Sequence, residues 1–121
     1  MCGDFDDHER IDDELFERFL ARAASFGVAF SSGAADAPSQ LESEEERAAY
    51  MQQLFAAGLT RCAKDAGNLQ HGDRMDAIAG QAIVFARLAG FLTAQLPPDT
   101  DLFRSATNAL LDGHAEASRL D

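Results

Sequence analysis

The stretch "AIAGQAIVFARLAGFL" (77–92) decides the fold expected for this chain of 121 residues. It is the most apolar run in the sequence, and it is interrupted only by Gln81 and Arg87. Its apolar residues lie nearly all round a helix of 3.6 residues per turn, a pattern typical of a helix that other helices surround. We therefore expect a helix from about 74 to 96, with Asp73 as its N-cap and the prolines at 97–98 as its stop.

Small side chains along one side of this expected helix indicate close packing against a neighbour. They are Ala79, Ala82, Ala86, Ala89 and Gly90. The same spacing occurs in membrane helices, but a 16-residue run that contains Gln81 and Arg87 is too short and too interrupted for a comfortable span. The sequence therefore predicts packing in a soluble protein and no membrane association.

Another helix is expected after the prolines, from about 101 to 118, with Thr100 or Asp99 as its cap. Its apolar stripe consists of Leu102, Phe103, Ala106, Ala109, Leu110 and Ala117. Because the link between the two helices is short, they are expected to form an antiparallel hairpin.

Before the central run, a helix is expected from about 44 to 66. Ser43 is placed to act as N-cap, and Glu46 follows three residues later, as in a capping box. Gly67 is the expected C′ residue, because it tolerates a positive φ. The apolar stripe of this helix consists of Met51, Phe55, Gly58, Leu59 and Cys62. Cys62 is accordingly expected to be a small core residue.

The first helix is expected from about 13 to 30, with Asp12 able to cap it. Its apolar face contains Ile11, Leu15, Phe16, Phe19, Ala23, Phe26 and Phe30. The stretch "SSGAADAPSQ" (31–40) is small, polar and contains glycine and proline, so it should end this helix. We expect residues 1–11 to be a mobile acidic lead-in and residues 31–41 to be a flexible connection.

No alternating run or hairpin-turn signal indicates a β-strand. The sequence therefore predicts an all-α fold, a bundle of about four helices at roughly 13–30, 44–66, 74–96 and 101–118. A chain of 121 residues is expected to form a single domain over 1–121.

The charge of the chain limits its partners. The net charge is −11, and 13 of the 21 acidic residues lie in residues 1–47. Such a field repels phosphate groups, so neither nucleic acid nor an anionic membrane is an expected partner. The 2 cysteines, 60 residues apart, indicate no disulfide framework, and the acidic start does not resemble a signal peptide. We expect a cytoplasmic protein.

No catalytic, cofactor or metal motif stands out, so we expect no enzyme activity, no cofactor and no metal. A calcium loop starting at Asp4 would place Glu9 where glycine is required and Leu15 where glutamate is required. The Glu-x-x-His pattern of di-iron bundles does not occur in the sequence.

Two residues are candidates for ligand binding. Arg87 is the only charge within 77–98, and it suggests an anchor for an acidic ligand between helices. The alternative is an arginine at the rim of the core, or one paired with an acid of another helix. His114 borders the apolar stripe of the last helix and is expected either to line such a pocket or to lie at the edge of the core.

Three functions are compatible with these observations. The first is a non-enzymatic interaction or regulatory module that self-associates, expected as a homodimer, with Phe16, Phe19, Phe26 and Phe30 as interface candidates. The second is a helical sensor or carrier that binds a small apolar or acidic ligand near Arg87. The third is an acidic decoy for a basic protein partner, which requires residues 1–17 and 42–46 to form one surface.

Overall fold

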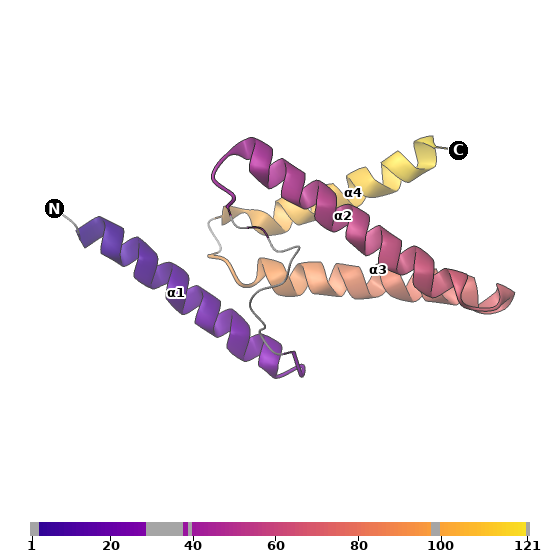
Figure 1. The fold of residues 1–121 in the computed structure, drawn as a ribbon, viewed down its shortest axis with the longest axis horizontal. Coiled ribbons are helices and arrows are strands. Elements are labelled where there is room, and N and C mark those ends of the chain that lie inside the picture. The colour runs from indigo at the N-terminus through magenta and orange to yellow at the C-terminus, as the bar shows by residue number, and fades with distance from the viewer. Residues whose placement is uncertain (1–2, 29–37, 39, 98–99, 121) are drawn as a thin grey trace. The chain divides into compact units, whose positions relative to one another are not determined.

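The computed structural model describes residues 3–28, 38, 40–97 and 100–120, with side chains described from Ile11 onward. It contains four helices: α1 (Gly3–Ala24), α2 (Glu44–Gly67), α3 (His71–Thr93) and α4 (Leu102–Arg119) (Figure 1). Helix accounts for 82% of the described residues, and none of these residues lies in a strand. The expected all-α fold with four helices is therefore confirmed.

The chain divides into two compact units, one of which is discontinuous in sequence. The central unit comprises residues 31–86, and the terminal unit comprises residues 1–30 together with 87–121. Helix α3 contributes residues 71–86 to the central unit and residues 87–93 to the terminal unit. The single domain expected over 1–121 stays a prediction.

Helix α1 begins at Gly3, ten residues before the expected start, so Asp12 lies inside the helix and does not cap it. The helix ends at Ala24 because Gly27 adopts a left-handed conformation with φ of 81°. The amide of Val28 then donates to the carbonyl of Ala23 at 3.2 Å, the long closing bond of a glycine-terminated helix. The expected end at residue 30 is wrong, because the chain turns at Gly27.

Helix α2 follows the expectation most closely. Ser43 is its N-cap, and the Ser43 Oγ accepts a 3.0 Å hydrogen bond from the amide of Glu46. At the other end Gly67 is the last helical residue, and Asn68 is the C-cap with φ of −80°. The amide of Asn68 donates to the carbonyl of Lys64 at 3.2 Å. The helix is thus closed without a positive φ, and the expectation of a left-handed Gly67 is wrong.

Helix α3 begins at His71, so Asp73 lies in its first turn and is not its N-cap. It ends at Thr93, before the expected residue 96. A residue that precedes proline is driven out of the helical region, which excludes Leu96 from the helix. Gln95 closes the end, because its Nε2 donates to the carbonyl of Phe91 at 2.8 Å.

Helix α4 begins at Leu102, and its N-cap position is held by Asp101 in the left-handed region, with φ of 56°. The side chain of Asp101 makes no capping bond. Thr100 does not cap the helix either, since its Oγ1 donates to the carbonyl of Pro97 at 2.8 Å. Asp99 lies outside the described residues. Contacts within the terminal unit partly support the expected hairpin of α3 and α4.

Candidate functional site

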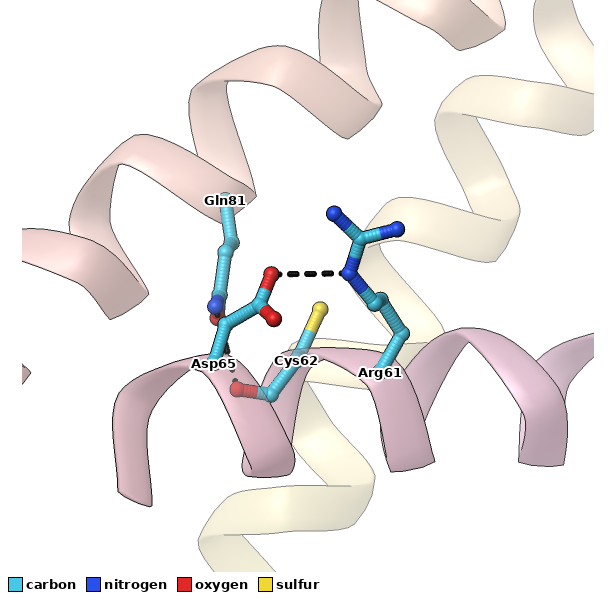
Figure 2. A network of polar contacts seen from close by, with 4 residues as sticks. All are labelled: Arg61, Cys62, Asp65 and Gln81. Atoms are coloured by element: carbon cyan, nitrogen blue, oxygen red, sulfur yellow. Dashed lines mark hydrogen bonds and ion pairs between the residues drawn. The ribbon is translucent and has the colours of Figure 1, made fainter. Parts of the chain in front are cut away.

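The central unit is a helical hairpin whose two helices meet through small and polar residues. Gly58, Cys62 and Ala66, spaced four apart, are the least exposed residues of the C-terminal half of α2. On α3, Ala77 and Gln81 are the only residues of 71–86 that are half-buried, and the others are exposed. The Nε2 of Gln81 donates to the carbonyl oxygen of Cys62 at 3.0 Å (Figure 2). We call this line of contact the hairpin seam.

The exposed pair Arg61 and Asp65 lies beside the seam on α2, with Nε and Oδ2 2.9 Å apart (Figure 2). The two residues are one helical turn apart, and a pair of this kind contributes only about 0.3–0.5 kcal/mol. Cys62 is half-buried and its thiol is free. Of the polar contacts around Cys62, the bond from Gln81 is therefore the one that joins the two helices.

Large apolar residues of the central unit remain outside the seam. Among all described residues only Ala66 is buried. The expected apolar stripe of α2 is largely uncovered, since only its small members, Gly58 and Cys62, lie in the seam. Nine large apolar residues of the central unit are 45–70% exposed. They are Met51, Leu54, Phe55, Leu59, Met75, Ile78, Ile83, Val84 and Phe85.

In the terminal unit, phenylalanines from both ends of the sequence form a cluster. Phe16 and Phe19 on α1 have ring centroids 6.2 Å apart, and Phe19 lies 6.4 Å from Phe91 of α3. Phe26, in the turn after α1, meets Phe91 edge-on at 5.6 Å. Three of the four interface candidates thus contact each other or Phe91 within this unit. The fourth, Phe30, lies outside the described residues.

Arg22 joins the same two segments through polar contacts. Its Nη1 donates to Oε1 of Gln95 at 2.9 Å and to the carbonyl of Ala94 at 3.5 Å. Sequence reasoning missed both Arg22 and Gln95 as structural residues. The only local signal was the position of Arg22 in the last turn of α1, where a cation is favoured by the helix dipole.

Arg87 is exposed, and its guanidinium carbon lies 5.6 Å from the centroid of the Phe26 ring. In the described part of the chain, no carboxylate forms an ion pair with it. His114 is exposed on α4, where its carbonyl accepts a hydrogen bond from Ser118. The ligand-binding roles suggested for Arg87 and His114 stay predictions.

A groove of about 320 Å³ lies elsewhere in the terminal unit, between α1 and the end of α3. It is lined by Asp12, Leu15, Phe16, Phe19, Leu92, Gln95 and Leu96. Gln95 is engaged through Oε1 with Arg22 and through Nε2 with Phe91. The charge that this mostly apolar groove offers to a ligand is therefore the carboxylate of Asp12.

The described residues contain no group of three or more His, Cys, Asp or Glu side chains placed to hold a metal ion. Helix α3, at 23 residues, is long and apolar enough to cross a membrane by length and composition alone. The expected absence of membrane association stays a prediction. The acidic clusters at 1–17 and 42–46 belong to different units, and the acidic decoy stays a hypothesis.

Comparison of the chain with protein-family models, with curated proteins and with solved structures gave no match. The function must therefore be argued from the residues of this chain. The feature with the clearest physical consequence is the uncovered apolar surface of the central unit.

Proposed function

We propose that this protein is a non-enzymatic helical interaction module that acts by associating with itself, and that its working form is a homodimer. The supporting observation is that its large apolar side chains are exposed while small residues occupy the hairpin seam. Phe55 on α2 and Ile83 on α3 are 64% and 70% exposed. Extended apolar patches of this kind mark interaction surfaces in soluble proteins.

The energetics favour association over a monomer. Burying a side chain such as Leu, Ile, Met or Phe stabilises a folded state by roughly 1.5–3 kcal/mol when burial is complete. Each of the large side chains of the central unit has much of that free energy still to gain. The net stability of a domain is only about 5–15 kcal/mol, so leaving this many large apolar side chains in water removes a large part of the free energy that could stabilise the fold.

Sedimentation equilibrium tests the proposal. We expect the wild-type chain at micromolar concentration to show twice its mass of 13.0 kDa. Its thermal unfolding temperature should rise with protein concentration, because association stabilises the folded state by mass action. A monomer whose cooperative unfolding does not depend on concentration would refute the proposal.

The groove beside Asp12 supports a second proposal, that the protein binds a small apolar ligand as a sensor or carrier. A volume of about 320 Å³ lies at the lower end of the range for ligand pockets. Because the available charge is Asp12, an aromatic amine fits this groove better than the acidic ligand expected near Arg87. We expect phenethylamine to raise the unfolding temperature more than 3-phenylpropionate does. If Asp12→Asn leaves that difference unchanged, this second proposal fails.

A further inference from the structure

The hairpin seam of the central unit is closed at one end and open at the other. The exposed fraction of the side chains rises along α2 from 8% at Ala66, next to the turn, to 64% at Phe55 and at Met51. Cys62, which lies between them, is half-buried. The seam is therefore covered near the turn at residues 68–70 and uncovered further along the helices.

The uncovered residues face the same way as the seam. At 100° per residue, Met51 and Phe55 each lie within roughly 20° of Cys62 around the axis of α2. On α3, Phe85 lies within roughly 40° of Gln81 by the same measure, and Phe85 is 45% exposed. The line along which the two helices meet thus continues into large apolar residues that α2 and α3 do not cover.

We propose that a second copy of this chain fills this open end, so that the α2–α3 hairpins of two copies interlock as a four-helix bundle. This inference rests on the proposed self-association and names the surface that carries it. Met51 and Phe55 of α2 form the inner face of each hairpin together with Phe85 and Val84 of α3, of which Val84 lies roughly 60° from Gln81 on the side opposite Phe85. They become the core of the bundle when the two copies meet.

The charge distribution favours a second copy as the occupant. A symmetric dimer brings the same patch of both copies together. Any charged residue in the patch would therefore lie near the identical charge of the other copy and be repelled by it. This is a severe restriction for a chain with a net charge of −11. Yet residues 48–60 of α2 and residues 77–86 of α3 contain no charged residue at all. The surface is therefore compatible with its own copy.

The uncovered surface also has the composition of a stable dimer interface. Nine large apolar residues of the central unit are 45–70% exposed. The interfaces of obligate homodimers are more apolar than the rest of a protein surface, and they resemble a domain core cut in half.

Sedimentation equilibrium of two charge-introducing variants tests this surface. Phe55→Glu places a carboxylate in the proposed core, and we expect it to weaken dimerisation at least about 100-fold. Phe103→Glu is the matched control, because Phe103 is 71% exposed on α4 and belongs to the terminal unit. We expect the control to dimerise like the wild type. Circular dichroism of Phe55→Glu reports whether its helices are retained.

A second measurement needs no variant and so does not depend on how Phe55→Glu folds. In an equimolar mixture of isotope-labelled and unlabelled wild-type chains, filtered nuclear Overhauser spectra report only contacts between copies. We expect contacts of Met51 and Phe55 with Val84 or Phe85 of the other copy. A dimer without such contacts would overturn the proposed surface and leave self-association standing.

The other possible results separate a failure of the proposed surface from a failure of self-association itself. If Phe103→Glu abolishes the dimer and Phe55→Glu does not, the chain associates through the terminal unit and this inference is wrong. If the wild type is a monomer, both the inference and the proposed function fail. If that monomer floats with phosphatidylcholine vesicles, the uncovered surface binds lipid and the second-copy inference is again overturned.

Discussion

The guanidinium group of Arg87 lies over the ring of Phe26, with its central carbon 5.6 Å from the ring centroid. The contact joins α3 to the turn that follows α1. It explains how a cation is accommodated on the most apolar helix, because the negative face of an aromatic ring attracts a guanidinium group. Sequence analysis offered an acidic ligand, a place at the rim of the core or an acidic partner for Arg87. In the structure Arg87 is exposed and lies over an aromatic ring.

A double-mutant cycle measures this contact. We expect Arg87→Met and Phe26→Leu to show a coupling of about 0.5–1 kcal/mol in the free energy of unfolding, the magnitude of an exposed cation–π pair. Urea denaturation at one fixed protein concentration provides the measurement, because dimer stability depends on concentration. Strictly additive single-mutant effects would mean that the contact contributes nothing.

Two glycine substitutions should change stability in opposite directions. Gly27→Ala forces alanine to adopt a φ of 81°, which costs about 1 kcal/mol of unfolding free energy. Gly113→Ala, inside α4, should stabilise the protein by roughly 0.5–1 kcal/mol through helix propensity. A new Cβ meets no atom within 4 Å at either site, so only the backbone conformation differs. Thermal denaturation of both variants checks the signs, and equal effects would contradict this account.

Ser43→Ala removes the side chain that caps α2. We expect a loss of about 1 kcal/mol in the free energy of unfolding, because the amide of Glu46 loses its acceptor. Ser118→Ala is the control. The Oγ of Ser118 only donates to the carbonyl of His114, in the last turn of α4, so its removal should change stability by less than about 0.5 kcal/mol. A cap effect no larger than the control effect would argue against the observed start of α2.

Gln81→Met keeps the length of the side chain and deletes its hydrogen bond across the hairpin seam. The loss of the 3.0 Å bond to the Cys62 carbonyl should lower the free energy of unfolding by about 1 kcal/mol. Gln52→Met, at an exposed position of α2, provides the control for adding a methionine to the same unit. We expect urea midpoints to separate the two variants, and coincident midpoints would speak against the bond across the seam.

Local signals predicted the helices better than their ends. The signal for the start of α2 is contained in the four residues from Ser43 to Glu46, and that start was predicted correctly. The start of α1 was missed because the acids before residue 12 carry no apolar pattern. Acidic residues near the N-terminal end of a helix are nevertheless favoured by its dipole, and the helix begins at Gly3.

Helical periodicity identified apolar faces without identifying their partners. It grouped Met51 and Phe55 with Cys62, and the three do share one side of α2. It did not indicate that α3 covers this side only near the turn, because periodicity contains no information on the distance between helices. The contact of Arg22 with Gln95 joins residues 73 apart, and no local pattern predicts a pairing at that separation.

The discontinuity of the terminal unit has a consequence for the order of folding. Gln81 and Cys62 are 19 residues apart, so the central hairpin closes a short loop and can form early during synthesis. Helix α1 is made before the central unit, yet its partners Phe91 and Gln95 emerge only after the whole central unit. Contacts between residues this far apart in sequence form slowly. The aromatic face of α1 therefore stays uncovered while the central unit is being synthesised, and we expect a chaperone to bind it during that interval.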